Sequence, residues 1–313
     1  FRINYKFNVK KMKKSPLVSI LMNCYNGEKY LQEAIDSILN QTYKNWELVF
    51  WDNQSYDKSA EIFLNNKDPR LHYYLSPSHT TLGNARIMAS KKIKGEWLGI
   101  IDTDDMWKPN KLAEQISTIN NTKLPRESIG LVYCRAMGID KNSVTTKEVC
   151  HKDYLEAPMP EGRILDDLLF KGNFIVSPSI LINKNIFLSV GGFPEGYLHA
   201  SDYYISCAIS SKANIICVDK CLTHYRIHDN NNTQKDKVVS FEEQLKIFQT
   251  WSKYIKVTLI KKNTRIKHLH TFAGLMMIKY NKQIIKGLLR ILRKGTLFFA
   301  IRKIVFELKK ISE

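Results

Sequence analysis

The chain has 313 residues, of which 44% are hydrophobic and 25% are charged, and it carries a formal net charge of +18. This length and composition exclude a largely disordered chain and favour one large globular domain with an appendage. The positive charge lies at the two ends: residues 1–14 contain six Lys or Arg and no acid, and residues 241–313 contain 17 Lys or Arg against four Glu. We therefore expect a nearly neutral body and a tail with a task of its own.

The six cysteines form no Cys-x-x-Cys pair, which argues against a zinc cluster, and several lie in apolar runs. We expect reduced thiols and a cytoplasmic setting. The best uncharged apolar run, 268–278, has eleven residues, against the ~20 that a membrane span needs, and no signal peptide is recognisable. Met12 could be a natural start, in which case residues 1–11 are an upstream or added segment.

Over the first 120 residues, short apolar runs alternate with helical patterns. The expected strands are 17–23, 46–51, 71–75 and 97–101. The expected helices between them are 31–39, 58–65 (with Asp57 as a cap) and 82–93. Strands that alternate with helices predict a parallel, doubly wound sheet with right-handed crossovers.

After residue 120 the alternation is looser. We expect further strands over 129–136, 144–150, 175–182 and 222–227, and helices over 164–170 and 201–211. The triplet Asn230-Asn231-Asn232 marks the expected boundary, and from Phe241 on the pattern is helical and basic. The sequence thus divides into a basic N-terminal segment over 1–15, an α/β domain over 16–233 and a basic helical region over 234–313.

Three carboxylates, Asp102, Asp104 and Asp105, directly follow the fourth expected strand, and Pro109 suits the first turn of a helix behind them. Negative charge concentrated at the end of an apolar strand is costly unless a cation approaches. The carboxyl ends of the strands of an open α/β sheet are also where ligands bind. This stretch therefore predicts a metal–diphosphate site. A solvated turn is the alternative, since about one Asp-x-Asp pair is expected by chance.

Several familiar motifs are absent from the sequence. The turn after the first strand holds the single Gly27, where a dinucleotide fingerprint needs three glycines, and neither a P-loop nor a Gly-x-Ser-x-Gly elbow is present. We therefore expect the phosphates to be bound through carboxylates and a metal rather than through backbone amides.

An ordered set of sequence blocks surrounds this site. The blocks are 18–26, 52–59, 83–86, 102–112, Gly191-Gly192-Phe193 with Ser201-Asp202-Tyr203, and 225–228. This set resembles the family 2 glycosyltransferases of the GT-A fold over residues 16–233. The resemblance implies a Rossmann-like, mixed and mainly parallel sheet flanked by helices, here with a basic helical C-terminal extension.

The resemblance also implies an activity. It is the inverting, metal-dependent transfer of a single sugar from a nucleotide-sugar donor, expected to be a UDP-sugar, to a hydroxyl of a glycan or lipid-linked acceptor, as in surface polysaccharide or lipopolysaccharide assembly. Addition of one sugar is expected because the Gln-x-x-Arg-Trp signature of processive members is missing.

For the donor, the resemblance implies base contacts from Asn23 and Tyr25 at the end of the first strand, although Tyr25 could equally lie in the core. Asp52 would accept the N3–H of uracil, a proton that cytosine lacks, but a turn-forming Asp fits the spacing as well. Arg86 would pair with the base-binding carboxylate or with the diphosphate, and an exposed structural arginine is the alternative.

The acidic triplet would hold the ion. We expect Asp104 and Asp105 near the metal, with Asp102 orienting the ribose and Asp104 also contacting the donor. His228 would add a ligand or a diphosphate contact, unless it is a structural histidine. Mn²⁺ or Mg²⁺ is the expected ion, since oxygen sites shared with phosphates suit hard cations, and it would neutralise the leaving UDP.

Asp202 matches the family's general base, which removes the proton of the acceptor hydroxyl. The family usually has Glu-Asp where this chain has Ser201-Asp202. The missing Glu leaves the orientation of the acceptor open. Without the resemblance, either residue would be interpreted as a helix cap.

In the tail, apolar residues recur at helical spacing among Lys and Arg. Such a cationic amphipathic helix over 284–311 can lie on an anionic membrane surface, or it can pack its apolar stripe on the protein. We expect a cytoplasmic protein that associates peripherally with the inner face of the membrane. No nucleic-acid partner is expected, because no motif accompanies the charge. The alternatives are a nucleotidyltransferase, which would need a basic glycine loop near the first strand, and a sugar-nucleotide-binding protein without turnover.

Overall fold

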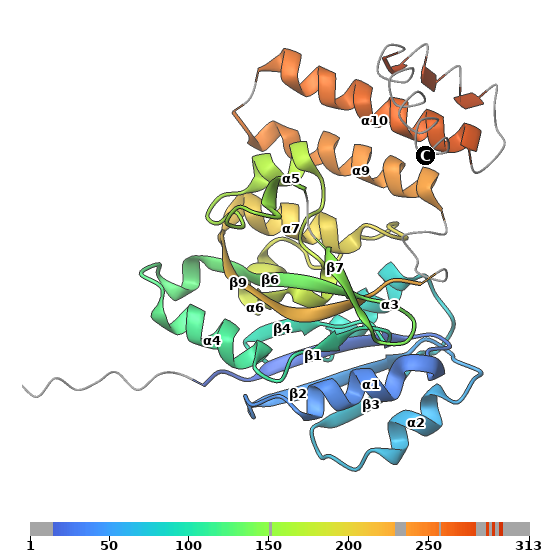
Figure 1. Ribbon diagram of the computed structural model, residues 1–313, viewed down its shortest axis with the longest axis vertical. Helices are drawn as coiled ribbons and strands as arrows, with labels where there is room; N and C mark the ends of the chain where they lie inside the picture. Colours follow the sequence, from blue (N-terminus) through green and yellow to red (C-terminus); the bar gives the residue numbers. More distant parts are fainter. Residues whose placement is uncertain are drawn as a thin grey trace, which may run out of the picture.

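The computed structural model describes residues 15–149, 152–228, 236–256 and 258–279, and in the tail 286–287, 290–291 and 294–296 (Figure 1). Its strands are β1 (Val18–Cys24), β2 (Trp46–Asp52), β3 (Leu71–Leu75), β4 (Trp97–Ile100), β5 (Met106–Trp107), β6 (Ile129–Ile139), β7 (Thr145–Val149), β8 (Leu181–Asn183) and β9 (Asn214–Arg226). Its α-helices are α1 (Glu28–Leu39), α2 (Ser59–Asn65), α3 (Leu82–Ser90), α4 (Lys111–Asn121), α5 (Leu165–Lys171), α6 (Lys184–Ser189), α7 (Ser201–Lys212), α9 (Lys237–Trp251) and α10 (Leu259–Lys279).

The described strands form one mixed sheet in the order β3-β2-β1-β4-β8-β6-β9-β5, with β7 paired to β6. The strands β3, β2, β1 and β4 are parallel, as the alternation with helices predicts. Beyond β4 the sheet becomes mixed, because β8 is antiparallel to both β4 and β6 whereas β6 and β9 are parallel. Every residue of β1, β2 and β4 is buried, which explains their nearly continuous apolar sequences.

Two of the expected strands differ from the structure. The apolar run 175–182 contributes only Leu181–Asn183, because Ser177–Ser179 forms a 3₁₀ turn containing Pro178, which cannot donate to a strand ladder. The last strand begins at Asn214 rather than at residue 222, since β9 pairs along the whole length of β6 through several register shifts.

The sheet buries apolar side chains on both faces. Ile20 and Met22 of β1 lie in one buried cluster with Ile35 of α1, while Leu21 lies in the other with Ile205 of α7. This alternation follows from the two-residue period of a strand. The strand ends that carry the acidic residues are therefore held by a core on each side.

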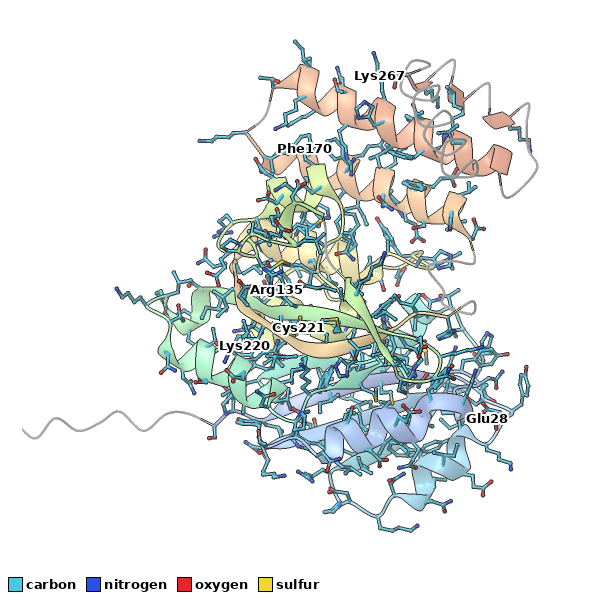
Figure 2. The ribbon with its side chains drawn as sticks, in the orientation of Figure 1. Glu28, Arg135, Phe170, Lys220, Cys221 and Lys267 are labelled. Carbon is cyan, nitrogen blue, oxygen red and sulfur yellow. The ribbon has the colours of Figure 1, made fainter. Side chains whose placement is uncertain are left out.

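Most of the described residues beyond 236 are helical, as expected. Helices α9 and α10 lie against each other, and α9 packs on α5 and α7 (Figure 1). Phe248 of α9 is 1% exposed and meets Phe170 of α5 edge to face, with ring centroids 5.6 Å apart. Figure 2 labels Phe170 where α5 lies close to α9. The assignment of 234–313 as a separate region stays a prediction. Among the described helices, none has the length and apolarity needed to cross a bilayer.

Candidate active site

The sheet register brings the ends of β1, β2 and β4 to one edge, as expected. Cys24 is paired with Asp52, and the backbone N–H of Asn53 donates to the carbonyl of Cys24 at 2.8 Å. The turn after β1 also touches the acidic loop. A Cβ atom added at Gly27 would lie 2.8 Å from the hydroxyl oxygen of Thr103, so a larger residue at this position would have to displace the Thr103 side chain. The acidic loop and the first two strand ends thus form one site.

Arg86 joins the two halves of this site. Its guanidinium is buried and donates to Asp102 Oδ1 at 3.1 Å and to Ser201 Oγ at 3.0 Å. The carboxylate partner of Arg86 is therefore Asp102 rather than Asp52. Because the guanidinium is buried, the alternative interpretation of Arg86 as an exposed structural residue is wrong. Ser201 stands where the family usually has Glu. Its hydroxyl oxygen accepts a hydrogen bond from the guanidinium of Arg86.

Asp104 and His228 form the second contact of the acidic loop, with 2.9 Å between Asp104 Oδ2 and His228 Nε2. Burial and the neighbouring charge of Asp102 raise the pKa of Asp104, while the hydrogen bond to His228 opposes that shift. Burial and a like charge both disfavour the ionised carboxylate, and added positive charge close to it would lower its pKa again. A divalent cation would supply that charge.

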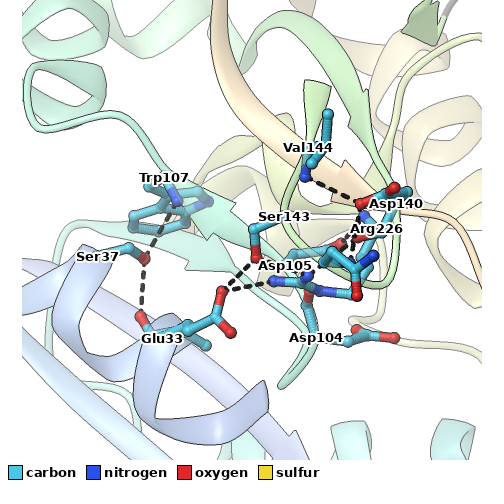
Figure 3. Close-up of polar contacts among 11 residues, drawn as sticks. Glu33, Ser37, Asp104, Asp105, Trp107, Asp140, Ser143, Val144 and Arg226 are labelled. Atoms are coloured by element: carbon cyan, nitrogen blue, oxygen red, sulfur yellow. Dashed lines mark hydrogen bonds and ion pairs between the residues drawn. The ribbon is translucent and has the colours of Figure 1, made fainter. Parts of the chain in front are cut away.

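Asp105 differs from the other two carboxylates of the triplet in its contacts, because it is 1% exposed and its Oδ1 accepts the backbone N–H of Arg226 at 2.9 Å (Figure 3). Burial raises its pKa well above the ordinary range. Its Oδ2 has no hydrogen-bond partner within the described residues. Asp105 is thus placed to hold β9 against the acidic loop.

Arg226 is the centre of this network, and its side chain is fully buried. It donates to the carbonyl of Asp104 at 2.8 Å, to the carbonyl of Asp140 at 3.1 Å, to Ser143 Oγ at 2.9 Å and to Glu33 Oε2 at 2.9 Å (Figure 3). The sequence block 225–228 pointed to this stretch, but nothing in the spacing indicated that the arginine fixes the backbone of the acidic loop.

Both carboxylate oxygens of Asp52 already accept hydrogen bonds from within the protein. Oδ1 accepts from the backbone N–H of Ser55 at 2.7 Å, and Oδ2 accepts from the hydroxyl of Tyr73 at 2.7 Å. Asp52 is also 1% exposed. These bonds give Asp52 the turn-forming role that its position in the sequence also allowed. A contact with uracil would use the lone pairs that remain.

The side chains next to Asp52 offer surfaces for a base. Tyr25 is exposed rather than in the core, and its ring lies 4.1 Å from that of His79 between centroids. Asn23 is buried, and its Nδ2 has no hydrogen-bond partner in the described part of the chain. An unpaired buried amide is costly, and a ligand oxygen would satisfy it.

Asp202 is the second residue of α7, and its Oδ2 accepts from the side-chain amide of Asn173 at 3.2 Å. The pKa of Asp202 is raised, mainly by burial and also by the nearby charge of Asp102. The guanidinium of Arg86 opposes this shift. A carboxylate with a raised pKa is a stronger base than an ordinary one. The side chain of Asp202 makes no cap of α7, whose N-cap residue is Ala200.

Within the described residues, no three His, Cys, Asp or Glu are arranged to hold a metal by themselves. Asp104 with His228 supplies two donors of suitable chemistry, with Asp102 close enough to shift the pKa of Asp104. Burial raises the pKa of Asp104 and of Asp105, and Asp105 Oδ2 has no hydrogen-bond partner within the described residues, so a nearby cation would stabilise the charged forms of these carboxylates. A donor diphosphate would complete such a coordination shell.

Known proteins are similar in sequence to this chain. An uncharacterized glycosyltransferase of Rickettsia typhi is 29% identical over 95% of this chain and 92% of its own. The UDP-Glc:alpha-D-GlcNAc-diphosphoundecaprenol beta-1,3-glucosyltransferase WfgD of Escherichia coli is 30% identical over 65% of this chain and 73% of its own.

Two solved structures have the same GT-A fold. S. aureus TarS in complex with UDP-GlcNAc aligns with a TM-score of 0.64 and 16% identity, covering 88% of this chain and 81% of that one. The mannosyltransferase PcManGT of Pyrobaculum calidifontis, in complex with GDP-Man and Mn²⁺, aligns with a TM-score of 0.61 and 15% identity, covering 95% of this chain and 81% of that one. A sequence model described as glycosyl transferase family 2 matches residues 19–186, and the chain belongs to that family.

Proposed function

We propose that this glycosyltransferase transfers one sugar, with inversion and with a divalent metal, from a UDP-sugar to a hydroxyl of a glycan or lipid-linked acceptor. The observation that carries the proposal is the Arg86 bridge. One buried guanidinium contacts Asp102 on the donor side and Ser201, the neighbour of the candidate base, on the other. A donor carboxylate and a base must lie close together when a hydroxyl attacks a bound sugar.

The donor is assigned to the edge formed by β1, β2 and β4. Tyr25 offers a ring face, Asn23 an unsatisfied amide N–H and Asp52 a buried carboxylate for the base. We assign Asp102 to the ribose and Asp104 to the diphosphate. A uridine nucleotide is supported by the UDP-Glc in the name of the E. coli relative and by the UDP-GlcNAc bound to TarS.

The metal is assigned to Asp104 and His228, with Asp102 beside them. Mn²⁺ or Mg²⁺, when bound there, offsets the negative charge that develops on the departing UDP. The Mn²⁺ in the PcManGT complex supports this assignment. For Asp105, the bond to the backbone of Arg226 favours a supporting role over the direct ligation that the sequence alone predicts.

Asp202 acts as the general base. The acceptor hydroxyl gives its proton to the Asp202 carboxylate as its oxygen bonds to the anomeric carbon. The bond from that carbon to the diphosphate breaks, and UDP leaves with the electron pair. Attack opposite to the leaving group inverts the anomeric centre. The raised pKa of Asp202 suits it to take a proton at this step.

A lipid-linked acceptor is supported by the diphosphoundecaprenol in the name of the E. coli relative. The expected membrane helix over 284–311 falls mostly outside the described residues. The described tip of α10, however, exposes Leu259 by 73% and Ile260 by 80%, next to Lys261. Flotation of the full chain with anionic vesicles tests a surface contact. A Leu259→Ser, Ile260→Ser double variant should float less, and equal recovery of both proteins with the anionic vesicles would argue against the contact.

Calorimetry tests the proposed function. UDP should bind wild-type protein in the presence of Mn²⁺ or Mg²⁺, and Asp104→Asn should weaken this binding at least tenfold. Asp36→Asn, on the exposed face of α1, is the matched control and should bind as wild type does. Binding of UDP that is indifferent to both metal and Asp104 would reject the proposal. Pyrophosphate release from UTP and a sugar phosphate, with no transfer from UDP-sugars, would favour a nucleotidyltransferase instead.

A further inference from the structure

Helix α9 places a carboxylate on the segment that precedes the candidate base. Glu243 is 6% exposed, and it accepts the backbone N–H groups of three consecutive residues. The distances are 2.5 Å from Leu198 to Oε1, 3.0 Å from His199 to Oε2 and 2.8 Å from Ala200 to Oε2. Hydrogen bonds from amides to an ionised carboxylate are stronger than neutral ones, so three of them hold a segment firmly.

The segment that Glu243 binds leads directly into the catalytic helix. Ala200 is the residue before α7, whose first two residues are Ser201 and Asp202. These three amides precede the first turn of that helix, where no helical carbonyl is available to them. The position of Asp202 is therefore coupled to a carboxylate about 40 residues further along the chain.

The opposite side of the same segment is fixed by α3. A Cβ atom added at Gly83 would lie 2.3 Å from the carbonyl oxygen of Tyr197, so the two backbones are in close contact. One turn along α9 from Glu243, the ammonium of Lys246 lies 4.6 Å from the centre of the Tyr197 ring. Residues 197–200 are thus held between α3, which carries Arg86, and α9.

The neighbouring Glu242 makes a different kind of contact, so the binding of backbone amides is specific to Glu243. Glu242 has a side chain that is 46% exposed, and its carboxylate pairs with Arg290 at 2.6 Å. Surface pairs of this kind contribute little to stability. Glu243, by contrast, gives up its hydration to bind backbone amides next to the reacting groups, which costs free energy unless the bonds are made.

We infer that Glu243 is a positioning residue that holds residues 198–200 so that Asp202 reaches the acceptor hydroxyl. This inference rests on the proposed function, because it takes Asp202 as the base. It assigns a role in transfer to the helical region beyond residue 233. The family match, which ends at residue 186, does not cover that region.

The test compares Glu243→Gln with Glu242→Gln. The amide that replaces the Glu243 carboxylate presents N–H groups to at least one of the three backbone donors, so that bond is lost while the size of the side chain is kept. We expect the amides of residues 198–200 to exchange hydrogen at least tenfold faster than in wild type. We also expect kcat to fall by about 10- to 100-fold with the affinity for UDP unchanged within twofold. Glu242→Gln should change none of these quantities.

Two further variants keep the inference open to refutation if Glu243→Gln folds poorly. Glu243→Asp keeps the carboxylate on a shorter side chain and should restore part of kcat. Gly83→Ala pushes on Tyr197 from the other side and should lower kcat in the same way. If amide exchange is unchanged in Glu243→Gln, or is faster while kcat stays normal, the inference about Glu243 is overturned. The proposed function is not affected by either result. A wild-type protein that binds UDP with metal but transfers no sugar overturns the proposed function together with the catalytic part of the inference.

Discussion

The proposed donor side and the proposed base side of the site are built in different ways. On the donor side, Asn23, Asp52 and Asp102 stand at the ends of strands whose parallel register already brings them together. On the base side, Asp202 follows an irregular segment that depends on Arg86 from α3 and Glu243 from α9. The donor side is therefore as rigid as the sheet, whereas the base side depends on a few side chains that are distant in sequence.

This difference predicts two kinetic signatures. Changes on the donor side should reduce the affinity for UDP and metal, because they alter groups that contact the nucleotide in the ground state. Changes on the base side should reduce kcat and leave that affinity intact, because they act on a group needed only when the hydroxyl attacks.

The sharpest separation should come from Asp202→Asn. The amide cannot accept the proton of the acceptor, so we expect kcat to fall by roughly 10² to 10⁴. UDP affinity with Mn²⁺ should stay within twofold, since no donor contact is assigned to this residue. Steady-state transfer assays and calorimetry on the same preparation measure both quantities. Near-normal turnover would remove Asp202 from the role of base.

The donor side should also respond to Arg226→Lys. A lysine can replace only part of the fork that binds the carbonyls of Asp104 and Asp140 and the side chains of Ser143 and Glu33. We expect UDP affinity to fall about tenfold as the acidic loop loosens, with a loss of about 3 kcal/mol in the free energy of unfolding. Calorimetry and urea unfolding measure the two effects. Lower stability with unchanged UDP affinity would show that Arg226 supports the fold but not the site.

The parallel half of the fold could be predicted because its signals are local. Uninterrupted apolar runs such as 46–51 alternate with amphipathic helices, and this pattern has one common solution. The mixed half could not be predicted in the same way. Strand β8 keeps only three residues of a longer apolar run, since Pro178 interrupts it, and the pairing of β6 with β9 joins segments that are far apart in sequence.

The same distinction between local and long-range signals holds for the candidate site. The acidic stretch after the fourth expected strand pointed to Asp102, Asp104 and Asp105, whereas Asp52 was indicated by the family resemblance. The parallel register places the ends of β1, β2 and β4 at one edge of the sheet. Glu243 gave no signal, because a glutamate in an amphipathic basic helix is ordinarily solvated. Its meaning arises only when packing of α9 on α7 brings it against three backbone amides.

Arg86 lies between the two sides, so its replacement should affect the pH dependence of transfer. The guanidinium lowers the pKa of Asp202, which burial otherwise raises above the ordinary value. Only the deprotonated carboxylate is a base, so kcat/KM falls as pH drops through that pKa. In Arg86→Met the acidic limb of the kcat/KM profile should move to higher pH. Arg126→Met, whose partner Glu96 lies at the other end of β4, should leave the profile in place. A limb that stays or moves to lower pH in Arg86→Met would refute the coupling.

The smallest effect is expected at Lys111, which supports the donor side without contacting it. Its ammonium is fully buried, donates to Gln115 Oε1 at 2.9 Å and lies 3.9 Å from the centre of the Trp107 ring. Burial lowers the pKa of Lys111 from 10.5 to about 8. Between about pH 8 and pH 10.5 the unfolded chain therefore binds a proton that the folded chain has released, so stability contributed by this group rises with pH in that window.

Lys111→Met isolates this contribution, because the tyrosines and cysteines that titrate in the same range are present in both proteins. We expect the free energy of unfolding of wild type, relative to Lys111→Met, to be constant below about pH 8. Above that pH it should rise by no more than roughly 3 kcal/mol. Urea unfolding at several pH values measures the difference. If the difference in the free energy of unfolding between the two proteins does not change with pH, Lys111 keeps its proton in the folded state. The surroundings of Lys111 would then tolerate a buried charge.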